Sequence, residues 1–170
     1  MRVQDFLDRL VRAKLWYWLL GRLSPRRVPQ GDKALWEAFV ANVNPYKLER
    51  IVLAAYREQG YSTVETPLSG DEGLDGLLYR DDSIAIGIQV KRYKHSVGSE
   101  MMRNFIGSLK VKGLEKGIFL MTGRVSHGAR QCAAKALVTI VEGDAFRKLL
   151  LDHVRGEVVR VVQASTVDPL

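Results

Sequence analysis

Three polar residues stand close together in the middle of the chain and could do chemistry as a group. They are Asp75, Gln89 and Lys91. A carboxylate, joined by a side-chain or backbone oxygen at position 89, is the kind of ligand that Mg²⁺ takes while it keeps several waters. Such a metal activates one of those waters and offsets charge on the phosphorus oxygens, and a nearby lysine can orient or deprotonate the water. These residue types therefore indicate metal-dependent cleavage of a phosphodiester.

The residues around this group alternate in the way of a β-strand. From residue 84 onward one face carries Ile84, Ile86, Ile88 and Val90, and the other face ends in Gln89 and Lys91. Asp81, Asp82 and Ser83 are typical of a turn, so residues 74–80 are predicted to pair antiparallel with the alternating strand. A turn centred on Asp82 places Asp75 directly across from Gln89, whereas a slip of one residue would put the two on opposite faces.

The elements that would hold this hairpin can be predicted from capping residues and apolar spacing. A helix begins at Pro45 with Asn44 as its N-cap and ends before Gly60, and other helices are expected from Asp32, Ser99, Ser126 and Asp144, the last through about Val154. Strands are expected over 61–66, 117–122 and 138–141. This order predicts an α/β fold, a mixed sheet with helices on both of its faces.

Composition narrows the class of protein. With 170 residues, 46% of them hydrophobic and 26% charged, the chain has the balance of one globular domain with a short appendage. The net charge of +7 favours polyanionic partners, and nucleic acid is the first of these to consider. A single cysteine, Cys132, excludes an internal disulfide and a cysteine-rich zinc cluster, and it fits a reducing, cytoplasmic setting.

The N-terminal region differs from the rest of the chain. An amphipathic helix is expected to run into the aromatic stretch LWYWLL (residues 15–20), and the proline-containing segment 24–31 is expected to be a linker. The predicted division is therefore an N-terminal helix and linker over residues 1–31, the main domain over 32–157, and a tail over 158–170. Three interpretations of LWYWLL stay open: packing on the main domain or on a dimer partner, which we favour, contact with a membrane surface, or a link to a lost domain.

The motifs around the hairpin resemble a known enzyme family. Gly60-Tyr61, the segment 66–76 (TPLSGDEGLDG) and the segment 89–94 (QVKRYK) are similar to the catalytic domain of Mrr-type restriction endonucleases, within the PD-(D/E)xK nuclease superfamily. The similarity continues through 116–122 and 140–143 and covers about residues 44–155. It implies a restriction-endonuclease-like fold with an αβββαβ core, and an active site that contains Asp75, Gln89 and Lys91.

The resemblance also implies a fourth site residue, a metal and a partner. Counting back from Gly60-Tyr61 places the helix glutamate of the family on Glu49 rather than Glu58. Mg²⁺, with Mn²⁺ as a substitute, would then be held by Asp75 with help from Glu49 and Gln89. Because cutting both DNA strands takes two sites, a homodimer is expected. The residues before Asn44 are too few for the winged-helix recognition domain of full-length relatives.

Basic residues after the catalytic strand are candidates for contact with the DNA backbone. The candidates are Arg92, Lys94, Arg103, Lys110 and Arg124, and ordinary solvated surface charge is the alternative explanation for them. Asp71 and Glu72 could add acidity to the site, although turn residues are the favoured interpretation.

Together these observations predict a metal-dependent DNA endonuclease that acts in restriction or defence against foreign or modified DNA. One alternative is a structure-specific nuclease, such as a junction resolvase, with the same core. Another is a catalytically silent module that binds DNA or serves assembly. The intact set of Asp75, Gln89 and Lys91 argues against a silent site.

Overall fold

The structure is a computed structural model that describes residues 28–66, 73–80 and 85–165. Its helices are α2 (Asp32–Asn42), α3 (Pro45–Glu58), α4 (Ser99–Val111), α5 (His127–Ala134) and α6 (Gly143–Ala164). Its strands are β1 (Ser62–Glu65), β2 (Gly76–Tyr79), β3 (Ile86–Lys91), β4 (Ser96–Val97), β5 (Lys116–Met121), β6 (Arg124–Val125) and β7 (Val138–Glu142). The predictions for the LWYWLL helix, for Asp71 and Glu72, and for the turn at Asp81 to Ser83 concern positions outside the described residues.

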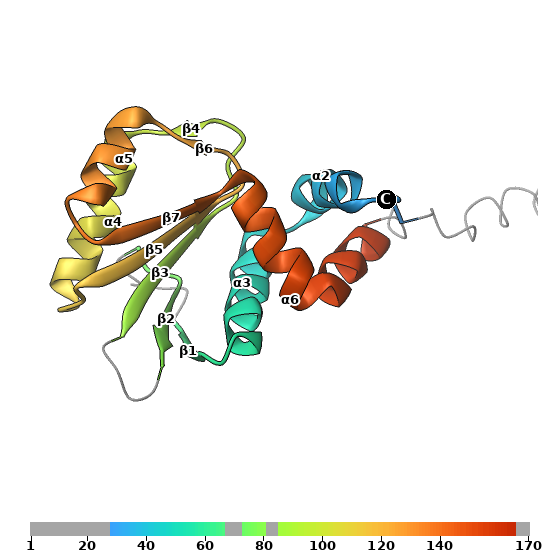
Figure 1. The fold of residues 1–170 in the computed structure, drawn as a ribbon, viewed down its shortest axis with the longest axis horizontal. Coiled ribbons are helices and arrows are strands. Elements are labelled where there is room, and N and C mark those ends of the chain that lie inside the picture. Colours follow the sequence, from blue (N-terminus) through green and yellow to red (C-terminus); the bar gives the residue numbers. More distant parts are fainter. Residues whose placement is uncertain (1–27, 67–72, 81–84, 166–170) are drawn as a thin grey trace, which may run out of the picture.

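Five of the described strands form a mixed sheet in the order β1-β2-β3-β5-β7 (Figure 1). β1, β2 and β3 pair antiparallel as a meander, whereas β3, β5 and β7 run parallel. The predicted α/β class with a mixed, helix-flanked sheet is therefore confirmed. A second, two-stranded parallel sheet joins β4 to β6, and the sequence did not predict it.

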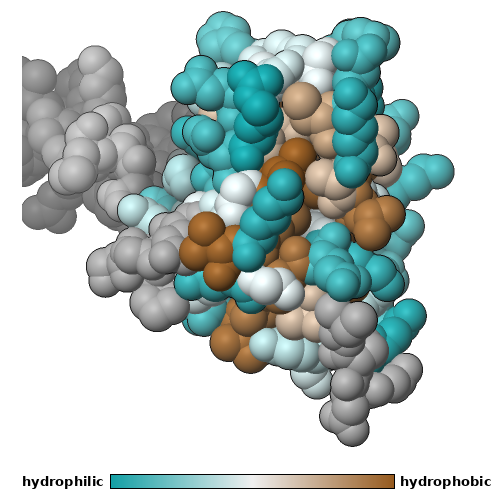
Figure 2. Space-filling view, turned by 90° about the vertical axis from the view of Figure 1, so that its left-hand side faces the viewer, coloured by the Kyte–Doolittle hydropathy of each residue, from teal (hydrophilic) through white to brown (hydrophobic). Residues whose placement is uncertain are grey.

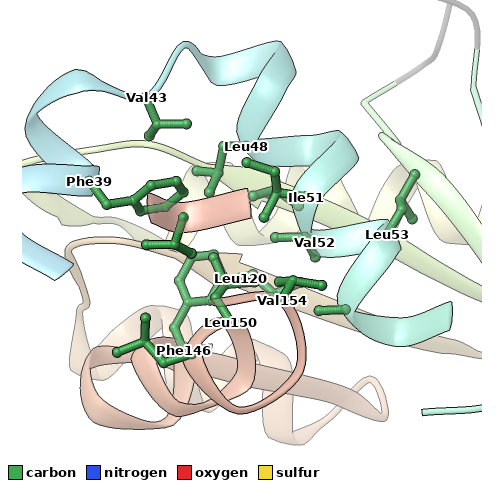
Figure 3. Packing of buried hydrophobic residues seen from close by; sticks show 14 of the residues in the cluster. Phe39, Val43, Leu48, Ile51, Val52, Leu53, Leu120, Phe146, Leu150 and Val154 are labelled. Carbon is green, nitrogen blue, oxygen red and sulfur yellow. The ribbon is translucent and has the colours of Figure 1, made fainter. Parts of the chain in front are cut away.

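Two hydrophobic clusters cover the two faces of the sheet. On one face, α3 and α6 pack Leu48, Val52 and Leu150 against Ile88 and Leu120 (Figure 3). On the other face, α4 and α5 pack Phe105 and Ala129 against Phe119 and Met121. Consecutive residues of β3 and β5 thus face different helix layers, as the alternation predicts.

The pairing of β2 with β3 confirms the predicted register over the residues where it is formed. Gly76 lies opposite Ile88, and Leu78 lies opposite Ile86. One further step along the same ladder places Asp75 opposite Gln89, at the end of the hairpin that is remote from its turn. The counting argument from the sequence therefore agrees with the register of the two strands.

Helix ends agree with the predictions in part. Asn44 accepts from the Tyr46 N–H at 2.9 Å and caps α3, and Ser126 accepts from the Ala129 N–H at 3.2 Å and caps α5. The capping roles predicted for Asp32 and Ser99 are wrong. Gly31 and Gly98 are the N-cap residues, and each helix begins at the residue that was predicted to be its cap. The two helices thus start one residue earlier than predicted.

The last helix is longer than the sequence predicts. The expected end near Val154 is where α6 bends, with φ −135° and ψ 33°, and the helix then continues to Ala164. Its second part buries Val158, Val161 and Val162 in the same cluster as Leu35 and Phe39. The predicted domain boundary after residue 157 falls inside this helix, and the division of the chain stays a prediction.

None of the helices in the described part of the chain combines the length and the hydrophobicity that crossing a membrane requires.

Candidate active site

Asp75 is fixed against the strand that carries the other two candidates. It lies directly before β2, and its N–H donates to the carbonyl of Ile88 at 2.8 Å. Its carboxylate Oδ2 accepts from the N–H of Val90 at 2.6 Å. Since Val90 stands between Gln89 and Lys91, the carboxylate lies beside the part of β3 where the sequence places the active site.

Gln89 is buried, with 5% of its surface exposed, and its amide has a defined partner. Nε2 donates to the carbonyl of Gly73, which belongs to the turn leading into Asp75. Because a carbonyl can only accept, the amide nitrogen must face Gly73, and Oε1 is the amide's remaining acceptor. Gly73 itself has φ +84°, and a Cβ there would lie 3.1 Å from Ser108 Oγ and 3.4 Å from Gln89 Nε2. Glycine and glutamine therefore fit each other at the entry to the Asp75 turn.

Lys91 closes β3 on the same side of the strand as Gln89. It is half-buried, lies opposite Met121 of β5, and its carbonyl accepts from the Thr122 N–H at 3.1 Å. Gly87, two residues before Gln89, packs under Leu109 of α4, so this side of the strand is the one covered by α4. Asp75, Gln89 and Lys91 thus gather at one end of the sheet, although their part in catalysis stays a prediction.

Glu49 belongs to a different layer. It lies half-buried on α3, which covers the opposite face of the sheet. The neighbouring Arg50 forms an ion pair with Glu65 at 3.6 Å, and Glu65 is the β1 residue that pairs with Gly76. The first turns of α3 therefore lie at the same end of the sheet as Asp75, which is compatible with the predicted role of Glu49.

The predicted DNA-contacting residues Arg92, Lys94, Arg103, Lys110 and Arg124 are all exposed. Arg92 also donates from Nη1 to the carbonyl of Val40 at 3.3 Å, which ties it to the last turns of α2. Arg103 and Lys110 lie on α4, and Figure 2 looks onto this helix and α5, where hydrophilic side chains flank a central hydrophobic strip. An open groove is lined by Ile106, Leu109, Leu114, Ala136 and Leu137, with Lys110, Glu115 and Lys135 also at its walls.

The structure also reveals a polar contact that the sequence did not predict. Glu142, the last residue of β7, accepts from the Val125 N–H at 2.6 Å and forms an ion pair with Arg130. It therefore fixes β6 and the start of α5 beside the carboxyl ends of the parallel strands. Only its position at the end of a predicted strand could have suggested this role.

The donor set near Asp75 suits a hard cation. No group of three or more His, Cys, Asp or Glu side chains able to hold a metal occurs among residues 28–66, 73–80 and 85–165. Mg²⁺ does not need such a cage, because it is commonly held by one or two carboxylates, waters and the phosphate of the substrate. The Asp75 carboxylate and the Gln89 Oε1, with Nε2 committed to Gly73, supply oxygen atoms and fit this pattern.

Comparison with known proteins places the chain in a family. Residues 40–150 match the Mrr catalytic-domain family, described as a restriction endonuclease, and this match spans more than half of the chain. The chain belongs to the Mrr restriction endonuclease family. The relationship predicted from the GY, GDEGLDG and QVKRYK motifs is therefore confirmed.

One curated relative and several solved structures agree with the family. The chain is 26% identical over 165 residues to the type IV methyl-directed restriction enzyme EcoKMrr of Escherichia coli (strain K12), covering 88% of this chain and 54% of that protein. The DNA modification-dependent restriction endonuclease AspBHI shares the fold with a TM-score of 0.57 and 20% identity, over 82% of this chain and 40% of AspBHI. The MspJI restriction endonuclease, solved with a 27-mer oligonucleotide, gives a TM-score of 0.54 and 20% identity, over 86% of this chain and 38% of MspJI. The chain thus spans about half the length of the curated relative.

Proposed function

We propose that this protein is a metal-dependent DNA endonuclease whose active site is built from Asp75, Gln89 and Lys91, with Glu49 as a fourth member. The observation that carries the proposal is the hydrogen bond from Val90 to the Asp75 carboxylate, because it holds this carboxylate between the two polar residues of β3. Family membership supports the same reaction class.

Each residue has a distinct task in the proposed reaction. Asp75, with Glu49 and the Gln89 oxygen, would hold Mg²⁺ or Mn²⁺, and the ion supplies water activation and neutralises charge on the phosphate. Lys91 orients the attacking water and donates hydrogen bonds to the phosphate as its charge grows in the transition state. The water oxygen bonds to phosphorus and gives up a proton to solvent, the bond from phosphorus to the leaving oxygen breaks, and that oxygen takes up a proton from solvent.

The biological role we propose is restriction of foreign or modified DNA. The names of EcoKMrr and AspBHI state dependence on methylation or modification, and MspJI was solved with an oligonucleotide. A homodimer would place one site at each DNA strand.

Plasmid cleavage tests the proposal directly. Wild-type protein is incubated with methylated and unmethylated plasmid in Mg²⁺, Mn²⁺ or EDTA. We expect cutting with either metal and none in EDTA, and we expect Lys91→Ala to lower the rate about 100-fold or more while DNA binding remains measurable.

Lys148→Ala is the matched control, because Lys148 is an exposed lysine on α6, outside the candidate site. It should cut like the wild type. Equal loss of binding and cutting in Lys91→Ala would instead indicate a binding module, and metal-independent cutting would refute the metal role.

A further inference from the structure

The chain makes a short excursion directly after Lys91. Lys91 is paired with Met121, and Ser96 is paired with Arg124, both in parallel ladders. From the first pair to the second the chain advances five residues on one side but three on the other. The two ladders belong to different sheets, and residues 92–95 form the longer of the two connections between them, next to the candidate site. We call this segment the Tyr93 bulge.

The Tyr93 bulge is held firmly by residues of the neighbouring strand connection. The hydroxyl of Thr122 accepts from the Tyr93 N–H at 3.0 Å and donates to the Tyr93 carbonyl at 3.2 Å. At Gly123, an added Cβ would lie 2.6 Å from the Tyr93 carbonyl oxygen and 2.7 Å from that of His95. Glycine is therefore required for the backbone of the bulge to rest directly on this turn.

The side chains of the bulge are exposed in spite of this fixed backbone. The Tyr93 side chain is 45% exposed and is not part of either core cluster. Its ring meets that of His95 edge-to-face, with centroids 6.2 Å apart and an interplanar angle of 78°. The cations Arg92 and Lys94 flank it on either side. An exposed aromatic ring on a fixed backbone, with cations next to it in sequence, has the properties of a nucleic-acid contact. In such contacts rings stack on bases and cations bind phosphates.

We infer that the Tyr93 bulge is a nucleotide-binding element, in which the Tyr93 ring packs against a base or sugar of the DNA strand that reaches Lys91. Thr122 acts as a positioning residue, because it sets the backbone on which the ring is mounted. The inference rests on the proposed function, because that function makes DNA the ligand. It adds to the site a contact that involves neither a metal ion nor a charged side chain.

Binding measured in EDTA tests this element separately from cleavage. The affinity of the full chain for a labelled 30-mer is measured by fluorescence anisotropy, once with single-stranded and once with duplex DNA. We expect Tyr93→Ala to weaken binding about tenfold, as loss of one aromatic stacking contact does, and Tyr93→Phe and Tyr93→Trp to stay within about twofold of the wild type. A larger loss on single-stranded DNA identifies a base as the partner, and equal losses identify the sugar.

Thr122 and Tyr46 supply the controls. Thr122→Val keeps the shape but loses both hydrogen bonds and should weaken binding about threefold, whereas Thr122→Ser should restore wild-type affinity. Tyr46→Ala removes another exposed tyrosine, 59% exposed on α3, and should change nothing. Thermal denaturation shows whether each variant is folded.

The outcomes separate this inference from the nuclease proposal. If the wild type cuts DNA and Tyr93→Ala binds both DNA forms with wild-type affinity, the inference is overturned and the nuclease proposal is not. A wild type that binds DNA but never cuts refutes the nuclease proposal, while the rank order of the Tyr93 variants still supports or overturns the binding element.

Discussion

At the scale of single residues, the amide at position 89 is the most informative group of the candidate site. The motif that names the superfamily writes an acidic residue at this position, and this chain has glutamine. The nitrogen of the amide donates to the Gly73 carbonyl, and an amide, unlike a carboxylate, offers both this donor and an oxygen that a cation can use. In the proposed site, Gln89 would therefore both offer an oxygen to the metal and hold the Asp75 turn in place.

Gln89→Glu should consequently lower both the stability and the cleavage rate, although it introduces the acidic residue that the superfamily motif has at this position. A carboxylate facing the Gly73 carbonyl leaves buried acceptors without a donor, which costs about 1–3 kcal/mol of stability. We expect cleavage to fall at least about tenfold, which corresponds to about 1.4 kcal/mol. Plasmid cleavage and urea unfolding measure the two effects.

Gln59→Glu is the matched control for this substitution. Gln59 also donates from Nε2 to a carbonyl, that of Ala55 at 3.1 Å, but it lies at the far end of α3. This variant can lose stability but should keep the cleavage rate of the folded protein. Wild-type cleavage by Gln89→Glu would show that the donor to Gly73 is dispensable.

Tyr56 makes the stability of the folded state depend on pH in the alkaline range. Burial, and secondly the charge of the nearby Tyr61, raise the pKa of Tyr56 from its ordinary 10.0 to about 12. The folded state thus holds this proton more tightly than the unfolded state. The resulting stability is fully present below pH 10 and is lost as the pH rises from 10 towards 12, by about 3 kcal/mol at most.

Urea unfolding at pH 9 and pH 11.5 tests this dependence. Because Tyr56→Phe has no ionisable group at this position, the wild type should lose more free energy of unfolding than the variant between pH 9 and pH 11.5. Tyr46→Phe, at an exposed position, should track the wild type at both pH values. Parallel behaviour of all three proteins would contradict the predicted shift.

At the scale of elements, two glycines decide how closely α4 approaches the sheet. Gly87 of β3 and Gly117 of β5 are partners in the parallel ladder, so they form a flat patch across two strands. A Cβ at either position would overlap Leu109, and at Gly117 it would also lie 2.9 Å from the Phe105 ring. The side of the sheet that carries Gln89 and Lys91 is therefore packed tightly against α4.

Gly117→Ala should destabilise the protein by about 1–3 kcal/mol through overpacking. Leu109→Ala alone leaves a cavity and costs about 2–5 kcal/mol. The double variant should lose less than the sum of the two, because the new methyl group enters the vacated space. Additive losses in chemical denaturation would mean that Leu109 does not rest on Gly117.

At the scale of the whole molecule, α2 and the second part of α6 belong to the core of the domain. The ion pair between Arg155 and Asp32 connects α2 with the second part of α6. The edge-to-face packing of Trp36 on Phe146, with ring centroids 5.4 Å apart, connects α2 with the first part of the same helix. Val158 is fully buried among them. Residues 158–164 thus pack into the core of the domain, although the sequence predicted that the domain would end at residue 157.

Val158→Asp should therefore lower the free energy of unfolding by about 3 kcal/mol or more, because it buries an unpaired charge. His153→Asp provides the comparison, since His153 is exposed on the same helix just before the bend. It should change stability by less than about 0.5 kcal/mol. Similar losses in both variants would place Val158 outside the core.

Much of this architecture could be predicted because it depends on local patterns. The alternation around Gln89 fixed the strand and its faces, and the caps Asn44 and Ser126 fixed two helices. The β4–β6 pair was missed, since two-residue strands carry no periodicity. The hydrogen bonds between Thr122 and Tyr93 and the Gln89–Gly73 bond were missed because they join segments far apart in sequence, which only the folded chain brings together.

The bond from Arg92 to the Val40 carbonyl connects the end of α2 with the residue that follows Lys91. Protein engineering around this domain should respect that connection. A displacement of α2 would therefore reach the residue after Lys91 through this hydrogen bond as well as through the hydrophobic cluster that α2 shares with β3. Activity assays are therefore best compared between proteins tagged at opposite ends, with Arg92→Lys, which lacks the planar guanidinium, as a probe of this hydrogen bond.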